Sequence, residues 1–144
     1  MKFLIFLLLL SSTLTAQVAV NNQGSPRIIG EVRNLGTPIA TLSTTPDSTY
    51  TLKFRDKQFA DDDKYQSITF KATPDDIATL YNAFKQVHHS SNIKNKSFSL
   101  SITLGPTPVT IKNYTYMGVV MCEVVTPSGF FQLTKNQVDK LFGK

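Results

Sequence analysis

Cysteine is almost absent from this chain of 144 residues, which carries a single one at position 122. One cysteine excludes an internal disulfide, and small proteins exported by eukaryotes usually carry several such bridges. The residue that a bacterial lipoprotein acylates is also missing, because no cysteine precedes Cys122. A disulfide-free exported chain fits the bacterial periplasm or outer surface. Its length is enough for one domain with a core that needs no covalent or metal staple.

Side chains with catalytic or metal-binding chemistry are also scarce. The only histidines, His88 and His89, are adjacent, and neighbours on a helix point about 100° apart, so a helix end explains them better than a metal site. Residues 61–63 are three aspartates without EF-hand spacing, which favours a solvated loop over a cation site. Cys122 lies in a predicted strand, where a buried, inert thiol is favoured over a nucleophile.

Short catalytic and cofactor motifs are missing too. The chain has no Gly-rich phosphate loop, nucleophile elbow, His-Glu-x-x-His or Cys-x-x-Cys sequence. We therefore expect no cofactor, no metal and a non-enzymatic protein. A small hydrolase with a dispersed active site stays open as an alternative, because such a site need not form a motif.

Long hydrophobic runs are missing after the first ten residues. Met1-Lys2 is a short positive segment, residues 3–10 are apolar, and Ala16 offers a cleavage point, which is the order of a secretory signal peptide. The run is shorter than the roughly 20 residues of a membrane-spanning helix. We predict a signal peptide at 1–16, with a retained interfacial anchor as the alternative, and a flexible leader at 17–27. The mature chain is then soluble, without a transmembrane segment, and secreted or periplasmic.

Acidic residues are outnumbered, with 10 Asp and Glu against 15 Lys and Arg and a net charge of +5. The excess falls by one when Lys2 leaves with the signal peptide. The basic residues are scattered and mostly lysine. A nucleic-acid or other polyanion partner is therefore permitted but not indicated.

Alternating apolar and polar residues are abundant in the rest of the chain and predict strands. The predicted strands cover 27–35, 38–44, 49–54, 65–72, 97–104, 109–116, 118–125 and 130–133. Helical spacing replaces the alternation after the fourth and the eighth strand. Thr73 and Thr134 stand where each helix should begin, and a threonine there can accept a hydrogen bond from the first turn.

The same sequence pattern occurs at both of these strand-to-helix junctions. Residues 70–81 read FKATPDDIATLY and residues 131–142 read FQLTKNQVDKLF. Both place an aromatic residue, a capping threonine and an apolar stripe at matching positions. Four strands precede each copy, which indicates an internal repeat, although chance likeness between two such junctions is the alternative.

These elements predict an α+β fold, a largely antiparallel sheet with helices on one face. Residues 28–144 would form a single domain of tandem ββββα pseudo-repeats at 28–90 and 97–144. This order resembles the tandem repeats of the Pur-alpha class of nucleic-acid-binding proteins over most of the mature chain. The resemblance is one of topology and implies the fold; nucleic acid is not expected as the partner of an exported protein.

The strand faces opposite the apolar stripes carry small hydroxyl residues, lysines and tyrosines. Such a face would form a flat platform rich in hydrogen-bond donors, with an ordinary solvated sheet face as the alternative. Its candidate binding residues are Lys53, Lys71, Lys112, Tyr114 and Tyr116.

The strand at 118–125 departs from the alternation because it is apolar on both faces. Val119, Met121 and Val125 would interrupt the platform with an apolar patch. Such a patch is costly to leave in water, so we expect a partner to cover it. Val119 and Met121 therefore join the candidate binding residues.

Three functions are compatible with these features. The first is an exported binding or interaction protein that meets a protein or glycan partner on the sheet face, with a homodimer through that face as one form of it. The second is a polyanion or single-stranded nucleic-acid binding module, whose affinity would fall steeply with salt. The third is the small hydrolase. The ligand and the oligomeric state do not follow from the sequence.

Overall fold

The computed structural model describes residues 24–59 and 61–144, and it confirms the α+β fold. The predicted signal peptide and residues 17–23 of the predicted leader lie outside the described residues. In the part of the chain that is described, no helix is long and apolar enough to cross a membrane.

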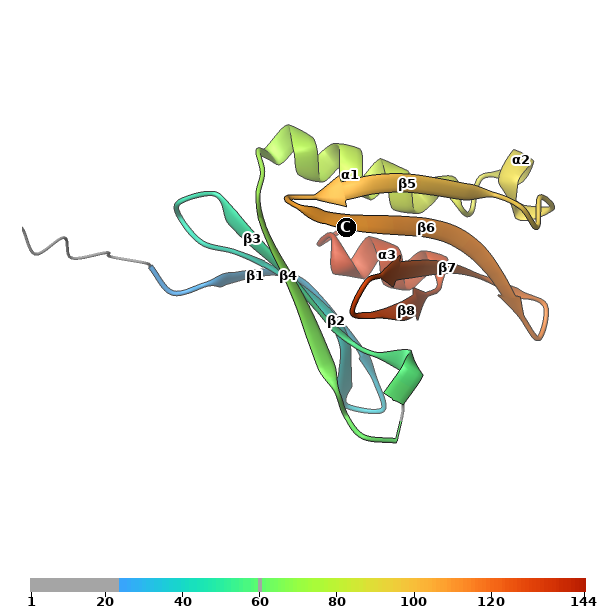
Figure 1. Cartoon of the computed structure of the whole chain (residues 1–144), viewed down its shortest axis with the longest axis horizontal. Helices are drawn as coiled ribbons and strands as arrows, with labels where there is room; N and C mark the ends of the chain where they lie inside the picture. Colours follow the sequence, from blue (N-terminus) through green and yellow to red (C-terminus); the bar gives the residue numbers. More distant parts are fainter. Residues whose placement is uncertain (1–23, 60) are drawn as a thin grey trace, which may run out of the picture.

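Eight strands form two antiparallel sheets in which neighbours along the chain pair with each other (Figure 1). The first sheet contains β1 (Arg27–Asn34), β2 (Thr37–Thr44), β3 (Thr49–Arg55) and β4 (Tyr65–Lys71). The second contains β5 (Ser99–Leu104), β6 (Thr107–Tyr116), β7 (Val119–Thr126) and β8 (Gly129–Leu133). The predicted strands are therefore present, but they divide into two sheets rather than one.

Each sheet is followed by a helix, so the order ββββα occurs twice. The helices are α1 (Pro74–Gln86) and α3 (Lys135–Leu141), and two short elements, η1 (Lys57–Phe59) and α2 (Ser90–Ile93), lie in the connections. Thr73 and Thr134 cap the two longer helices with reciprocal capping boxes, as the sequence predicts. The shared order is a structural fact, whereas a common origin of the two halves stays a prediction.

One core joins both sheets and both longer helices. Phe54 of β3 stacks on Phe131 of β8 with ring centroids 4.7 Å apart, and both side chains are fully buried. Phe142, at the end of α3, packs against Tyr81 and Phe84 of α1, with 5.3 Å between centroids in each pair. These contacts connect residues far apart in sequence, so the core belongs to the whole chain rather than to either half.

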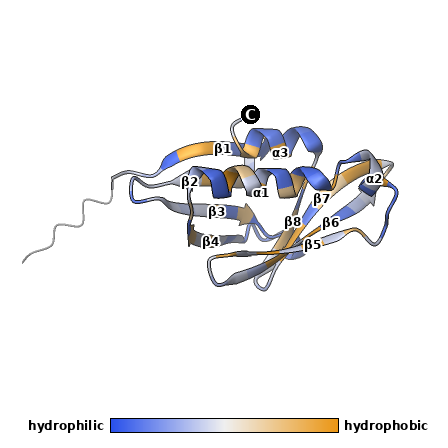
Figure 2. Cartoon of the chain, turned by 90° about the horizontal axis from the view of Figure 1, so that it is seen from above, coloured by the Kyte–Doolittle hydropathy of each residue, from blue (hydrophilic) through white to orange (hydrophobic). Residues whose placement is uncertain are grey.

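The helix of the second half rests partly on the sheet of the first. α3 contacts β1 and β2 as well as β7 and β8, and it lies beside α1 (Figure 2). Gly30 in β1 makes this close approach feasible, because a Cβ at that position would stand 2.1 Å from the carbonyl oxygen of Lys140. The two ββββα units are therefore interlocked.

Candidate binding surface

The β6–β7 hairpin brings together five of the seven candidate residues. Lys112, Tyr114 and Tyr116 alternate along β6, while Val119 and Met121 face the same side of β7. Tyr114 pairs with Met121 across the strands, and Tyr116 pairs with Val119. We call these five residues the hairpin surface, and residues 116–119 its tip.

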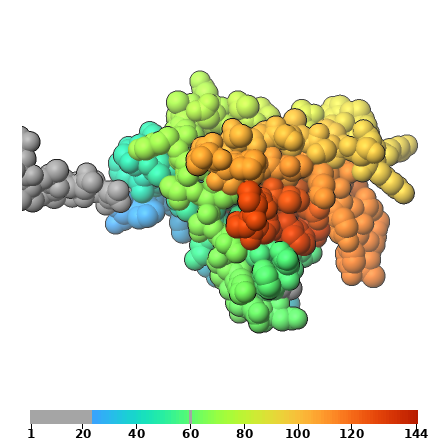
Figure 3. Space-filling view, in the orientation of Figure 1, coloured from blue at the N-terminus to red at the C-terminus, as the bar shows by residue number. Residues whose placement is uncertain are grey.

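The tip is apolar and exposed. Tyr116 is 59% exposed, Met117 87% and Val119 51%, whereas Tyr114 is 41% exposed and Met121 is half-buried. In the space-filling view the hairpin, in orange, projects beyond the body of the molecule (Figure 3). Apolar side chains gathered on a projecting element are typical of contact sites, because leaving them in water is unfavourable.

The turn at the tip has a bulky residue, Met117, in a backbone conformation that favours small or polar residues. Met117 and Gly118 both have positive φ, 48° and 80°. Such two-residue turns usually carry Asn, Asp or Gly at the first position, and a bulky residue with positive φ is an outlier. The turn between β1 and β2 repeats this arrangement with a fully exposed Leu35 followed by Gly36. Packing within the chain does not require an exposed apolar side chain at either turn position, and the two turns differ in that only residues 116–119 also carry exposed Tyr116 and Val119.

A polar network limits the apolar part of the hairpin surface. Glu123, on the same face of β7, is 9% exposed and forms an ion pair with Lys112 at 3.1 Å. Gln132 of β8 donates to Glu123 and accepts a hydrogen bond from the ammonium of Lys57 at 2.6 Å. The apolar patch predicted over Val119, Met121 and Val125 is thus divided, because Glu123 stands between the last two.

A cavity of about 240 Å³ adjoins this network where β7 and β8 meet the ends of the first sheet. Met121 and Gln132 line it from one side, and Ile39 and Asp56 line it from the other. The side-chain amides of Gln132 and Gln137 are engaged, since Gln132 bonds to Glu123 and Gln137 serves the cap of α3. Oδ2 of Asp56, in contrast, is buried without a hydrogen-bond partner among the described residues.

Asp56 is a buried residue that the sequence does not single out, since it stands at the start of a charged connection between two predicted strands. Its side chain is fully buried, and Oδ1 accepts hydrogen bonds from the backbone N–H groups of Gln58 and Phe130. Gly129 packs so closely that a Cβ there would stand 2.3 Å from Oδ2. Asp56 therefore ties the end of β3 to the edge strand β8. The only sequence signal was an acidic residue directly after an alternating strand.

Lys53 and Lys71, the remaining candidates, lie on the outer face of the first sheet and not on the hairpin surface. The ammonium of Lys53 lies 4.9 Å from the centre of the Tyr65 ring. Lys71 forms an ion pair with Asp47 at 2.7 Å and also donates to the backbone carbonyl of Asp47. The pKa of the Asp47 carboxyl is lowered, chiefly by its hydrogen bond with Lys71. Both lysines thus have local partners on a separate surface.

The residues considered for chemistry are engaged in the fold. Cys122 is fully buried, as predicted, and burial raises the pKa of its thiol to about 12, which keeps it protonated. His88 follows α1 and donates from Nε2 to the carbonyl of Val120 at 3.1 Å, whereas His89 caps α2. Helix α1 itself ends at Gln86 with Val87 as its cap, so neither histidine is the cap that the sequence predicted. Among the described residues, no group of three His, Cys, Asp or Glu side chains could hold a metal ion.

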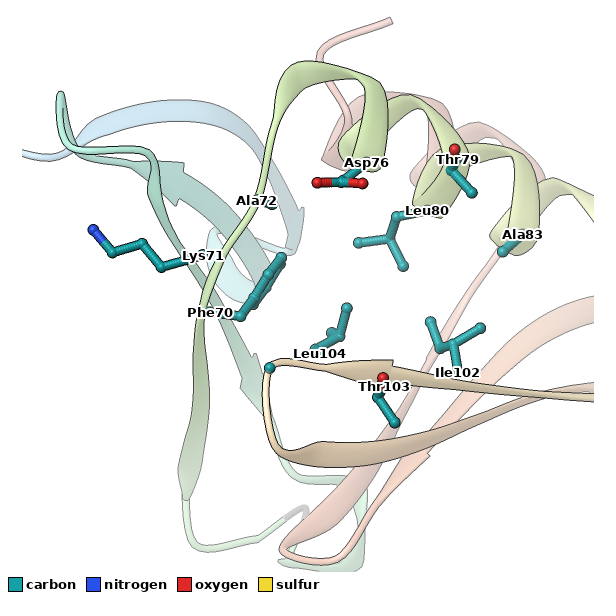
Figure 4. A pocket seen from close by; sticks show the side chains of 11 residues that line it. Phe70, Lys71, Ala72, Asp76, Thr79, Leu80, Ala83, Ile102, Thr103 and Leu104 are labelled. Atoms are coloured by element: carbon teal, nitrogen blue, oxygen red, sulfur yellow. The ribbon is translucent and has the colours of Figure 1, made fainter.

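A groove of about 240 Å³ runs between α1 and the edge strand β5 (Figure 4). Leu80, Ile102 and Leu104 point into it, and Lys71 points away from it. Asp76 stands on the rim, but its carboxylate accepts the N–H of Thr73 at 2.8 Å in the helix cap, and this bond lowers its pKa. The groove is apolar and brings no acid–base pair together.

Comparison with known proteins identifies no relative. No family model matches the chain, and neither the curated proteins nor the solved structures include a significant match.

Proposed function

We propose that this chain is an exported, non-enzymatic binding protein that makes its contacts through the hairpin surface of the second sheet. The observation that carries the proposal is the exposure of Tyr116, Met117 and Val119 on a projecting hairpin. In the longer helices, in contrast, the apolar residues pack in the core and the first polar residues form the caps. The proposal concerns the surface, and it holds for a protein, a glycan, a lipid surface or a second copy of the chain as partner.

The chemistry of the described residues supports a non-enzymatic role. The thiol of Cys122 is buried and protonated, and the imidazole of His88 is bonded to a backbone carbonyl. The apolar groove beside α1 and the cavity beside β8 hold no nucleophile next to a base, which hydrolysis by side chains would require.

A charge introduced on the strand and a charge reversed on a helix test the surface for a protein partner or a second copy of the chain. Val119→Lys places a cation in the middle of the apolar tip, and Lys85→Glu changes an exposed residue of α1 as the matched control. We expect Val119→Lys, and more strongly its combination with Met121→Lys, to weaken self-association in size-exclusion chromatography or capture of a cell-envelope partner. Lys85→Glu should have little effect.

Circular dichroism keeps this test interpretable. Val119 is half-exposed, so a variant at this position should remain folded, and Met121 provides the second, more buried position. Loss of binding with an unchanged spectrum supports the proposal. If Lys85→Glu weakens binding more than the strand variants do, the contact surface lies on the helices and the proposal is wrong.

Export is tested on the protein itself. We propose that a bacterial cell removes residues 1–16 and places the mature chain in the periplasm or outside the cell, on the strength of the order of charged, apolar and small residues. The mass of the protein recovered from the envelope or the medium should correspond to a chain that begins at Gln17. A mass that includes Met1 would contradict the signal peptide.

A further inference from the structure

The middle of the chain is free of acidic residues. No Asp or Glu occurs between Asp76 and Glu123, whereas Lys85, Lys94, Lys96 and Lys112 all lie there. The flanking acids are engaged, since Asp76 caps α1 and Glu123 pairs with Lys112. The exposed loop that carries Lys94 and Lys96 is therefore positively charged, and it complements a negatively charged partner.

Two of these lysines, Lys94 and Lys96, lie at the same end of the molecule as the hairpin tip. The side-chain amide of Asn113 in β6 donates to the carbonyl oxygens of Asn92 and Asn95, both at 2.8 Å. These bonds fasten α2 and the loop that follows it against β6, on the face opposite Lys112 and Tyr114 because Asn113 alternates with them, and at the end of the molecule from which the hairpin projects (Figures 1 and 3). The loop carries Lys94 and Lys96, both exposed, next to Ile93, which is 39% exposed.

The apolar tip and the cationic loop together have the composition of a membrane-surface anchor. Proteins that bind lipid surfaces reversibly combine a small apolar element with a basic patch, because either signal alone is weak. Tyrosine also favours the boundary between lipid and water, and anionic lipids attract nearby lysines. Tyr116, Met117 and Val119 would supply the first signal, and the lysines of the loop the second.

We propose that the hairpin tip docks on an anionic lipid surface, with Tyr116, Met117 and Val119 entering the boundary between headgroups and acyl chains. Lys94 and Lys96 contact the lipid phosphates. This assignment rests on the proposed function, because it names the partner of the same surface. It also explains why Met117 occupies a turn position that favours Asn or Gly: the side chain is kept at the outermost point of the hairpin.

Single-stranded nucleic acid is the competing partner, and the tip fits it less well. Nucleic-acid platforms stack bases on aromatic rings along a basic groove. Here Met117 is the most exposed apolar side chain of the tip, and Val119 of the tip and Ile93 of α2 are exposed as well. These aliphatic side chains cannot stack on bases but can enter a bilayer.

Vesicle sedimentation of the chain from Gln17 onward, which contains every residue the structure describes, tests the assignment. The probes are phosphatidylcholine vesicles with and without phosphatidylglycerol, at about 0.1 M and about 1 M salt, where the screening length falls from about 10 Å to about 3 Å. We expect binding only with the anionic lipid and at the lower salt. Equally strong binding to vesicles with and without phosphatidylglycerol would overturn the proposal. A lack of binding to either kind of vesicle would overturn it as well.

Met117→Asn is the decisive variant, because asparagine suits the turn and should leave the fold intact. Leu35→Asn makes the same kind of change at the equally strained turn between β1 and β2 and serves as its matched control. We expect Met117→Asn to weaken vesicle binding about tenfold or more, since it removes an apolar side chain that would enter the lipid. Lys94→Gln with Lys96→Gln should weaken binding too, and Lys53→Gln on the first sheet should not. Equal losses for Met117→Asn and Leu35→Asn would overturn the assignment.

Fluorescence supplies a second readout, because the chain has no tryptophan. Met117→Trp places one reporter at the tip and Leu35→Trp one at the control turn. Anionic vesicles should shift the emission of the first to the blue and leave the second unchanged. Binding of an oligothymidylate without any shift on vesicles would assign the surface to nucleic acid. If vesicles do not bind but Val119→Lys still disrupts a protein complex, the lipid assignment fails while the proposed function stands.

Discussion

At the scale of single residues, His88 has an environment that favours its neutral form. Its Nε2–H is held by the carbonyl of Val120, and its buried Nδ1 has no hydrogen-bond partner among the described residues. Burial is the main cause that lowers the pKa of His88, and the charge of Lys135 acts in the same direction. The bond to Val120 and the charge of Asp139 act the other way but do not outweigh burial.

A pH dependence of stability follows from this environment. The pKa of His88 in the folded protein lies below the ordinary value of about 6.5. At pH values between these two pKa values, the unfolded chain therefore binds more protons than the folded protein does. The free energy of unfolding should therefore be highest above about pH 6.5 and fall as the pH drops toward the folded-state pKa.

Urea unfolding at a series of pH values measures this dependence. His88→Gln, whose amide can still donate to Val120, should flatten the fall. The same change at the exposed His89 should not alter this dependence of the free energy of unfolding on pH. A wild-type slope that persists in His88→Gln would assign the dependence to other groups.

Single residues also show the limit of sequence reasoning here. Alternation places Tyr50, Leu52 and Phe54 correctly in the core, because the two sides of a strand follow from its period of two. The period does not show which strands share a surface, so the sequence groups Lys53 and Lys71 with the hairpin residues although they lie on the other sheet. The burial of Asp56 depends on a strand seventy-odd residues away along the chain and leaves no local pattern.

At the scale of elements, α1 separates the effect of a cap from that of a core residue. Thr73 accepts the N–H of Asp76 at 3.1 Å, and Thr73→Ala should cost about 1 kcal/mol of stability, as is typical for a lost N-cap. Leu80 is 6% exposed, so Leu80→Ala should cost more, about 2–5 kcal/mol, toward the lower end because its side chain borders a groove. Urea unfolding of both variants gives the two values. Equal, small losses would mean that α1 is not docked through Leu80.

The seating of α3 on β1 gives a second prediction at this scale. A methyl group at Gly30 would meet the backbone carbonyl oxygens of Lys140 and Leu141 at 2.1 and 2.4 Å, and backbone cannot move aside cheaply. Gly30→Ala should cost about 1–3 kcal/mol or more and should lower the hydrogen-exchange protection of α3. Gly36→Ala, in an open turn with positive φ, is the control that adds only local strain. Unchanged protection of α3 in Gly30→Ala would contradict the close packing.

The elements themselves could be predicted from sequence to a large extent. Among the described residues, the strands other than β7 and both longer helices follow from alternation, helical spacing and the two capping threonines, which are local signals, whereas β7 follows from its apolar, β-branched run. Helix α2 and η1 are too short to show a period. The division into two sheets and the position of α3 on β1 could not be predicted, because they depend on packing between distant parts of the chain.

At the scale of the whole molecule, the two ββββα units share their stabilising contacts. Phe54 stacks on Phe131 between the sheets, Phe142 packs on Phe84 between the helices, and Asp56 accepts the N–H of Phe130. Each contact joins one half to the other. A unit on its own would expose these side chains, and a chain of that length has little other apolar surface to bury.

Neither half should therefore fold alone. Residues 17–96 and 97–144, prepared separately, should show no cooperative unfolding transition in urea, because each lacks the other half of the core. Mixed at equal concentration, they should recover a cooperative transition and a near-ultraviolet circular dichroism signal from the packed tyrosines, such as Tyr81 against Phe142. Phe131→Ala in the second fragment, which removes the stack on Phe54, should reduce the recovery, whereas Phe59→Ala in the first fragment changes a partly exposed ring and should not. A cooperative transition from either fragment alone would show that the halves are independent domains. The contacts between the halves would then not be required for either half to fold.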